Sequence, residues 1–204
     1  KKFLISDMDS TMITVECIDE LADYAGIKAE IAEITERAMQ GELDFEAALR
    51  GRVALLKGLH ISAIDQCLDE RVRLMPGART LVQTMRARGA QTILVSGGFT
   101  KFAKPVAAMI GFDSYHANIL AEEDDHLTGA LDGDIVDAAR KAELLKANAA
   151  AAGLPLAATL AVGDGANDIP MIKQAGLGIA YHAKPKAALA ADVALKYNDL
   201  TALL

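Results

Sequence analysis

The sequence predicts an α/β protein with a doubly wound, mostly parallel sheet, an inserted helical cap and a small β-hairpin insertion. Two observations lead to this prediction. Short apolar runs, typical of buried parallel strands, alternate with longer segments of helical periodicity. Residues 16–74 break the alternation, because they carry helical patterns and no convincing strand. With 204 residues, the chain is long enough for one sizeable core and a smaller inserted module.

The first predicted strand is the apolar run at residues 3–5. It ends abruptly in Asp7 and Asp9, which are followed by Ser10 and Thr11. By itself this cluster is as consistent with a polar turn and helix-capping side chains as with a site for chemistry. The rest of the sequence has to decide between these two interpretations.

The helical segment after this strand is too long for an ordinary connection between a strand and the next α/β unit. We therefore predict a catalytic core formed by residues 1–15 and 75–204, with residues 16–74 inserted as a helical cap that governs substrate specificity. A second irregularity lies at residues 115–136, where two alternating runs flank an acidic turn. That pattern predicts the β-hairpin.

The other elements follow the alternation of strands and helices. The segment 77–89 follows Pro76 and ends in Gly89, as a helix typically does. The segment 140–153 is rich in helix-forming residues and ends in Gly153. The remaining predicted strands are residues 92–95, 159–162 and 177–180.

Polar residues follow three of these strands at the point where each strand ends. In an open α/β sheet, ligands bind outside the carboxyl ends of the strands, so clusters far apart in sequence should meet in space. This expected convergence is a stronger signal than any one cluster. The residues concerned are Asp7, Asp9, Ser96, Gly97, Gly98, Asp164, Asn167 and Asp168.

Four of these residues are carboxylates: Asp7, Asp9, Asp164 and Asp168. Like charges placed so close together cannot all stay ionised without a cation. The candidate ligands are oxygens, with no cluster of His or Cys, and this favours a hard ion. Mg²⁺ fits best, because it binds through one or two carboxylates, water and substrate phosphate.

The same edge of the sheet offers groups that attract an anion. Ser96 supplies a hydroxyl, and Gly97 and Gly98 allow backbone N–H groups to approach closely. Lys141, near the start of its predicted helix, adds a cation. Carboxylates, a hard metal, small donors and a lysine together suit a phosphoryl group.

Two aspartates at a spacing of two residues allow a division of labour. One carboxylate attacks phosphorus and forms an aspartyl phosphate. The other protonates the leaving oxygen and then deprotonates the water that hydrolyses the intermediate. General acid–base catalysis of this kind typically contributes about 10²- to 10⁴-fold.

Four motifs, in this order, resemble the signatures of the haloacid dehalogenase-like phosphohydrolases. They are Asp-Met-Asp-Ser-Thr at 7–11, Ser-Gly-Gly at 96–98, Lys141, and Gly-Asp-Gly-Ala-Asn-Asp-Ile-Pro-Met at 163–171. Together they span most of the chain, and a cap following the first motif is also similar to that family. The resemblance implies an α/β core and a Mg²⁺-dependent hydrolysis of phosphomonoesters.

The resemblance also implies roles for individual residues. Asp7 would be the nucleophile and Asp9 the general acid and base. The metal would be held by Asp7, the backbone carbonyl of Asp9 and Asp164, with Asp168 in its outer shell. The residues implied to bind or orient the phosphate are Ser96, Gly97, Lys141 and Asn167.

Three further segments resemble the phosphoserine phosphatases within this family. They are residues 15–26, 39–59 and 96–107. This narrower resemblance implies that Glu16 binds the substrate ammonium and that Arg52 binds its carboxylate. Met39 and Phe45 would close the apolar wall of the site. The implied reaction is hydrolysis of O-phospho-L-serine, the last step of serine biosynthesis.

Two kinds of alternative remain at this point. The core motifs predict cleavage of a phosphate ester but not the leaving group, so phosphoglycolate, phosphohomoserine or a nucleoside monophosphate could be the substrate, and a phosphotransferase uses the same motifs. Glu16 together with Arg52 favours an amino acid. A signalling receiver domain also carries a phosphorylatable Asp, an acidic Mg²⁺ pocket and a lysine, but it is shorter and needs no cap.

Composition excludes several other classes of function. The net charge of −7 and the lack of a Lys/Arg-rich run argue against a nucleic-acid partner. No apolar stretch reaches the roughly 18 residues of a membrane span. Asp7 comes too early for a secretory signal. Cys17 and Cys67 lack metal-ligand spacing and fit buried thiols in a reducing cytoplasm. We expect a cytoplasmic enzyme with a small-molecule substrate; its oligomeric state cannot be derived from the sequence.

Overall fold

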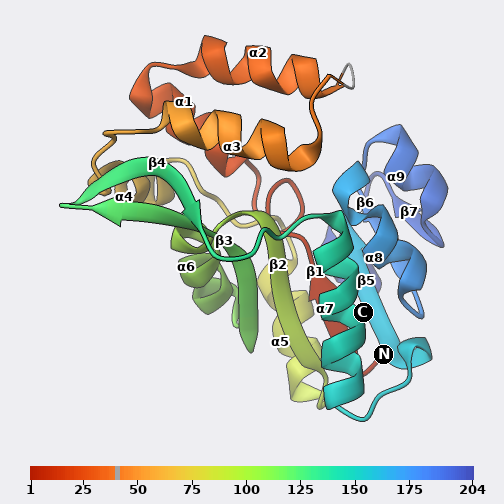
Figure 1. The fold of residues 1–204 in the computed structure, drawn as a ribbon. Coiled ribbons are helices and arrows are strands. Elements are labelled where there is room, and N and C mark those ends of the chain that lie inside the picture. The colour runs from red at the N-terminus through yellow and green to blue at the C-terminus, as the bar shows by residue number, and fades with distance from the viewer. Residues whose placement is uncertain (40–41) are drawn as a thin grey trace.

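The computed structural model describes residues 1–39 and 42–204 (Figure 1). The strands are β1 (Phe3–Ser6), β2 (Gln91–Phe99), β3 (Ser114–Glu123), β4 (His126–Asp132), β5 (Thr159–Gly163), β6 (Gly178–Tyr181) and β7 (Val193–Leu195). The α-helices are α1 (Cys17–Ala25), α2 (Lys28–Met39), α3 (Phe45–Leu55), α4 (Ser62–Glu70), α5 (Ala78–Ala87), α6 (Thr100–Ile110), α7 (Ala138–Ala151), α8 (Ile169–Gln174) and α9 (Pro185–Ala190). Short 3-10 helices are η1 (Leu156–Ala158), η2 (Ala166–Asp168) and η3 (Leu200–Leu203).

The strands form one sheet in the order β4-β3-β2-β1-β5-β6-β7. Neighbouring strands are parallel, except for the antiparallel pair β3 and β4. β1 lies in the middle, where Phe3 is paired with Gln91 of β2 on one side and with Thr159 of β5 on the other. This arrangement confirms the predicted doubly wound, mostly parallel sheet.

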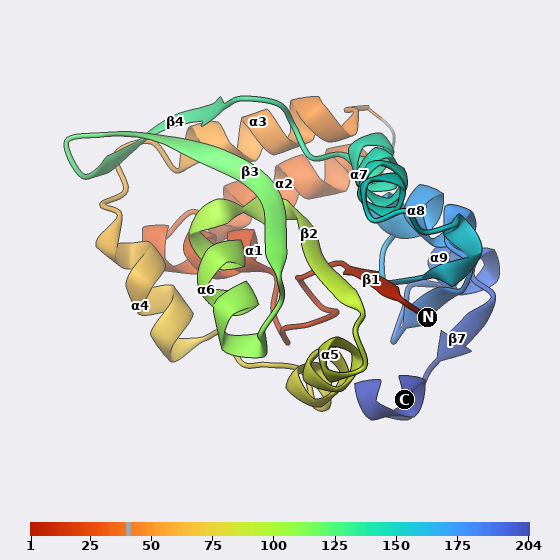
Figure 2. The same ribbon diagram turned by 90° about the horizontal axis from the view of Figure 1, so that it is seen from below.

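Side chains of the central strands enter apolar cores on both faces of the sheet. Phe3 and Ile5 of β1 pack in a cluster with Leu145 of α7 and Met171 of α8. Leu4 points to the opposite face, where its cluster includes buried side chains of α5 and α6. Figure 2 shows these two helix layers on either side of the sheet. Burial on both faces explains why these strands are continuously apolar.

The sheet is wider than the sequence patterns indicate. β7 adds an edge strand after β6. β3 first pairs in parallel with β2, with Ser114 opposite Ile93 and His116 opposite Val95, before it turns back into β4. The hairpin predicted at residues 115–136 is present, but its first strand also belongs to the main sheet. The polar start of β3 hides this role, because it lies near the edge of the sheet and is only partly buried.

Helices α1, α2 and α3 lie beyond the carboxyl ends of the parallel strands, and α4 contacts α6 (Figure 1). The chain enters and leaves this helical region through two paired backbone segments. Thr14 N–H donates to the Arg73 carbonyl (3.0 Å), and Met75 N–H donates to the Met12 carbonyl (2.9 Å). One cluster of buried side chains nevertheless joins α1 and α4 to the sheet. The division into a core and a cap of residues 16–74 therefore stays a prediction.

Within residues 1–39 and 42–204, none of the helices combines the length and the apolar character that crossing a membrane requires.

Candidate active site

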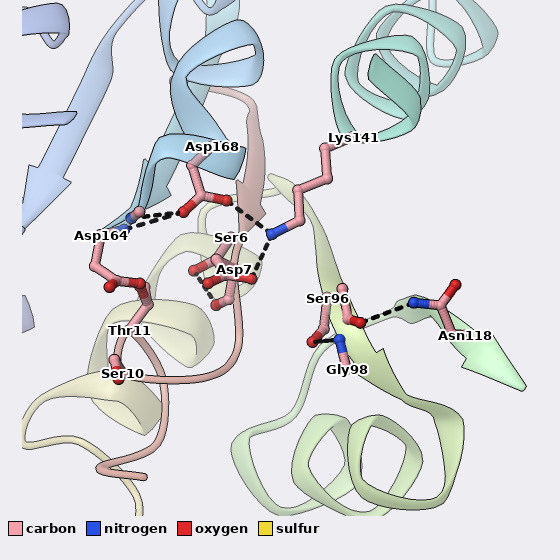
Figure 3. Close-up of polar contacts among 12 residues, drawn as sticks. Ser6, Asp7, Ser10, Thr11, Ser96, Gly98, Asn118, Lys141, Asp164 and Asp168 are labelled. Atoms are coloured by element: carbon pink, nitrogen blue, oxygen red, sulfur yellow. Dashed lines mark hydrogen bonds and ion pairs between the residues drawn. The ribbon is translucent and has the colours of Figure 1, made fainter. Parts of the chain in front are cut away.

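The ends of β1, β2 and β5 bring the predicted polar residues together at one edge of the sheet (Figure 3). A cleft lies between these strand ends and helices α1 and α3. The predicted residues that line it are Asp7, Asp9, Glu16, Phe45, Arg52, Ser96, Gly97, Asp164 and Asn167. The convergence follows from the parallel sheet, because its strands end at a common edge.

Lys141 is completely buried and holds two carboxylates together. Its Nζ lies 2.5 Å from Oδ1 of Asp7 and 2.7 Å from Oδ1 of Asp168 (Figure 3). It lies in the first turn of α7, where Asp137 caps the helix by accepting a hydrogen bond from Arg140 N–H (2.7 Å). Burial lowers the pKa of Lys141, but Asp168 and Asp7 outweigh this effect and raise the pKa above its usual value. The ammonium therefore stays charged beside the Asp7 carboxylate.

Both oxygens of Asp168 are engaged by the surrounding protein. Oδ1 contacts Lys141, and Oδ2 accepts hydrogen bonds from the backbone N–H groups of Asp164 (3.2 Å) and Gly165 (3.0 Å). An added Cβ at Gly163 would lie 2.5 Å from the Asp168 carboxyl carbon, so this turn requires glycine. The engagement of both oxygens supports an outer-shell position for Asp168.

Three carboxylates lie close together at this edge of the sheet. Asp7, Asp164 and Asp168 each offer an oxygen atom, and these atoms lie within 4.8 Å of one another. Burial, and then repulsion from Asp168, raises the pKa of Asp7 well above its usual value and that of Asp164 to about 6. Thr11 is also buried here and donates its hydroxyl to Asp164 Oδ1 (3.1 Å). A crowded set of buried carboxylates fits a hard divalent cation.

Asp9 faces the cleft from the loop between β1 and α1. Its Oδ1 accepts a hydrogen bond from Cys17 N–H at the start of α1 (3.4 Å). Its Oδ2 lies close to Gly98, where an added Cβ would be 2.9 Å from that oxygen. Burial, and next the charge of Glu16, raises the pKa of Asp9 to about 7. Such a carboxyl group can donate and accept a proton near neutral pH.

The Ser96–Gly98 segment forms the opposite wall of the cleft. β2 continues through it to Phe99, so this segment is the end of a strand rather than a separate loop. The Ser96 hydroxyl accepts a hydrogen bond from Gly98 N–H (2.8 Å), and Asn118 Nδ2 donates to the Gly97 carbonyl (2.8 Å). These bonds fix the backbone against which a phosphate would bind.

Two charged residues of the helical region face the strand ends. Glu16 and Arg52 both line the cleft, and Glu16 Oε1 accepts a hydrogen bond from the Ser10 hydroxyl (2.6 Å). Arg52 Nε donates to the Ala48 carbonyl one turn earlier in α3 (3.3 Å). Burial lowers the pKa of Arg52, and the acidic residues Asp19 and Glu16 oppose that shift. An arginine stays protonated in such surroundings and can bind a carboxylate.

Phe45 and Met39 are the two residues predicted to form the apolar wall. The Phe45 ring lies over Gly97, where an added Cβ would be 3.2 Å from Cζ of the ring. Met39 ends α2, and its side chain lies outside what the structure describes.

Sequence reasoning missed Thr11, Asn118 and Lys184. Lys184 lines the cleft just after β6, and the strand-end rule applied to β6 would have found it.

Known proteins are similar to this chain in sequence and in fold. A family model described as haloacid dehalogenase-like hydrolase matches residues 4–173, and the chain belongs to that family. It is 48% identical over 204 residues to a phosphoserine phosphatase of Streptomyces coelicolor, covering 100% of this chain and 50% of that protein. It is 45% identical over 208 residues to a phosphoserine phosphatase of a Polaromonas species, covering 100% and 88%.

Solved structures lead to the same group of enzymes. A structure described as a phospho-aspartyl intermediate analogue of phosphoserine phosphatase superimposes with a TM-score of 0.91 at 40% identity, covering 100% of this chain and 97% of that one. The chain therefore spans nearly the full length of this structural relative, but only half the length of the Streptomyces relative.

Proposed function

We propose that this chain is a Mg²⁺-dependent phosphatase that hydrolyses O-phospho-L-serine to L-serine and phosphate. One observation carries the proposal. A single cleft contains two groups of side chains. The paired aspartates and the Ser96–Gly98 segment suit a phosphate. Glu16 and Arg52, one acidic and one basic, suit an amino acid. Membership of a hydrolase family and the phosphoserine phosphatases among its relatives support this proposal.

The first half of the proposed reaction transfers the phosphoryl group to the protein. A carboxylate oxygen of Asp7 attacks phosphorus, and the bond between phosphorus and the serine oxygen breaks. Asp9 gives its proton to that leaving oxygen, and an aspartyl phosphate forms on Asp7. Lys141 supports this step, because its buried ammonium fixes Asp7 in position and opposes the rise that burial and Asp168 cause in the pKa of Asp7.

The second half releases phosphate. Asp9, now a carboxylate, takes a proton from water, whose oxygen attacks the phosphorus of the aspartyl phosphate. The bond between phosphorus and the Asp7 oxygen breaks, and the Asp7 carboxylate is restored. The proposed Mg²⁺, held by Asp7, the Asp9 backbone carbonyl and Asp164, would reduce the repulsion between the carboxylate and the phosphate dianion.

The proposed substrate is bound at both ends. Ser96, Gly97 and Asn167 would receive the phosphate, while Lys141 acts on it through the adjacent Asp7 oxygen. Glu16 would bind the ammonium group, and Arg52 would form charge-assisted hydrogen bonds with the carboxylate. Met39 and Phe45 would form the apolar wall of the site.

The proposed setting is the final step of serine synthesis in the cytoplasm, with a small molecule as the partner. Cys17 and Cys67 are both free and buried, which supports a reducing compartment.

Phosphate release from a panel of esters tests the proposal. The panel contains phospho-L-serine, phospho-L-threonine, phosphoglycolate and a nucleoside monophosphate, each measured with Mg²⁺ and with EDTA. We expect a Mg²⁺-dependent preference for phospho-L-serine, and no turnover from Asp7→Asn. Preference for another ester would keep the roles of Asp7 and Asp9 and contradict those of Glu16 and Arg52. No release from any ester would contradict the proposed function.

A further inference from the structure

We propose that the β3–β4 hairpin sets the length of substrate that the cleft accepts. The hairpin does so by holding α3, and with it Arg52, at a fixed distance from the Ser96–Gly98 segment. This inference rests on the proposed function, because it assumes that Arg52 binds the substrate carboxylate while Ser96–Gly98 binds the phosphate. The hairpin itself does not line the cleft within the described residues.

The far end of the hairpin is bonded to the chain that follows α3. Leu127 N–H donates to the Leu59 carbonyl (2.9 Å), and Gly58 N–H donates to the Leu127 carbonyl (2.8 Å). Ile61 N–H donates to the carbonyl of Asp125 at the hairpin turn (2.9 Å). The segment between α3 and α4 therefore pairs with β4 like an additional strand. This pairing fixes the end of α3 on the hairpin.

The middle of β4 touches α3 directly, and Figure 1 shows the two running side by side. Gly129 has a φ of +81° and packs against the last turn of α3. A Cβ added there would lie 2.9 Å from Lys57 Cβ and 3.1 Å from the Ala54 carbonyl oxygen. Only glycine combines this backbone conformation with so close a contact. Any larger residue at position 129 would push α3 away from the hairpin.

The near end of the hairpin is bonded to the phosphate side of the cleft. Asn118 of β3 is buried, and its Nδ2 donates to the Gly97 carbonyl (2.8 Å) (Figure 3 shows Asn118 beside this segment). Its Oδ1 accepts a hydrogen bond from Val136 N–H, just after the hairpin (2.8 Å). The hairpin thus has one end on the phosphate side and the other on the helix that carries Arg52.

This double attachment makes the hairpin a spacer between two binding groups. A substrate that is held through its phosphate and its carboxylate must match the distance between the Ser96–Gly98 segment and Arg52. A substrate that lacks the carboxylate is held by the Ser96–Gly98 segment alone, so this distance does not affect its binding. Moving α3 should therefore weaken binding of phospho-L-serine and leave binding of a simple aryl phosphate nearly unchanged.

Gly129→Ala tests the spacer, with Gly133→Ala as its matched control. Both glycines have a positive φ (+81° and +72°), so both variants carry similar backbone strain, but a Cβ at Gly133 would meet nothing within 4 Å. We expect Gly129→Ala to raise KM for phospho-L-serine about tenfold, the size expected for a weakened charged hydrogen bond. For phenyl phosphate, kcat/KM should change less than about twofold in either variant.

A second readout does not depend on the substrate. Amide hydrogen exchange of residues 45–55 should be faster in Gly129→Ala than in Gly133→Ala, because α3 has lost its contact with β4. If Gly129→Ala does not fold, Ile61→Pro replaces it. Ile61 has a φ of −59°, which proline adopts, and the substitution removes the N–H that bonds to Asp125 together with a side chain that packs on the apolar cluster.

Two results would overturn the proposal. One is equal KM for phospho-L-serine and equal exchange of α3 in the two glycine variants. The other is an equal loss of activity on both substrates in Gly129→Ala. A parent enzyme without preference for phospho-L-serine would instead contradict the proposed function, and the exchange comparison would still report whether the hairpin holds α3.

Discussion

The cations around the cleft differ in whether they are paired with a carboxylate of the protein. Lys141 lies between two carboxylates and is fully buried. Arg52 and Lys184 line the cleft, and among the described residues neither forms an ion pair within 4 Å. These two side chains are therefore available to an anionic substrate. Their substitution should affect binding more than the chemical step.

Arg52→Ala should raise KM for phospho-L-serine about ten- to hundredfold, the range expected for a lost charge-assisted hydrogen bond. Its effect on phenyl phosphate should be small. Arg50→Ala is the control, because Arg50 lies two residues away on α3 and pairs with Glu46 at 2.8 Å on the exposed side. Steady-state kinetics with both substrates checks this expectation. Equal losses on the two substrates would contradict carboxylate recognition by Arg52.

Lys184→Ala should raise KM for phospho-L-serine about two- to fivefold and leave kcat nearly unchanged, because an exposed charge contributes modestly to binding. The loop that presents Lys184 is well fixed. The Lys184 N–H donates to the Asp164 carbonyl (3.0 Å), and the His182 N–H donates to the Leu195 carbonyl (2.8 Å). Lys186→Ala, on the exposed surface of α9, is the control. The difference between the two variants should shrink as salt is added; a difference that persists at high salt would contradict an electrostatic role.

The site could be predicted from the sequence where its residues follow strand ends. Asp7, Ser96 and Asp164 satisfy that rule, and the structure places all three around one cleft. Asn118 could not be found in this way, because it acts from the middle of a partly polar strand on a backbone carbonyl. Glu16 was identified by resemblance, since a charged residue near a helix start has no distinctive pattern.

At the scale of the element, two helices present functional side chains from capped first turns. Asp44 caps α3 by accepting a hydrogen bond from Ala47 N–H (2.7 Å), and Asp137 caps α7 in the same way. The first turn of α3 carries Phe45, and the first turn of α7 carries Lys141. The two caps therefore stabilise the turns that place Phe45 at the cleft and Lys141 beside Asp7.

Asp44→Ala and Asp137→Ala should each lower the free energy of unfolding by about 1 kcal/mol, the usual cost of a lost N-cap. Their kinetic effects should differ. Asp44→Ala should mainly raise KM, because α3 carries Phe45 and Arg52, the residues proposed to bind the substrate. Asp137→Ala should mainly lower kcat, because α7 positions Lys141 beside Asp7. Chemical denaturation and steady-state kinetics of both variants check this. Identical kinetic changes would contradict the assignment of separate tasks to the two helices.

Elements were predictable where one physical pattern dominated. The central strands are buried on both faces, so their apolar runs at 3–5 and 159–162 were sufficient. β7 lies at the edge of the sheet and consists of three apolar residues, which is too short a run to indicate a strand. α6 was not predicted, because Pro105, which usually disrupts a helix, lies inside it.

At the scale of the whole molecule, the crowded carboxylates should make stability depend on pH and metal. The folded protein raises the pKa of Asp9 to about 7 and that of Asp164 to about 6, from an ordinary value of 3.8. Folding therefore favours the protonated groups. Their contribution to stability is complete at pH values below about 4 and is lost as the pH rises through about 6 to 7.

Thermal unfolding in EDTA should therefore show a lower Tm at about pH 8 than at about pH 5.5, and Mg²⁺ should recover the loss at the higher pH, because a cation replaces the protons. Asp9→Asn, which removes one of the charges, should reduce the dependence on pH in EDTA. A metal-free protein that is more stable at about pH 8 than at about pH 5.5 would show that other groups control how stability depends on pH.

The central place of β1 has a consequence for synthesis of the chain. β1 lies between β2 and β5, and β5 ends at Gly163. At about 5–20 residues per second, translation takes roughly 8–30 s to reach that point from β1. Throughout this interval the edge of β1 that pairs with β5 is open, and Phe3 and Ile5 lack the cover of α8. The strand at the centre of the finished sheet is therefore the part of the nascent chain most exposed to aggregation, and slow translation before β5 would lengthen that exposure.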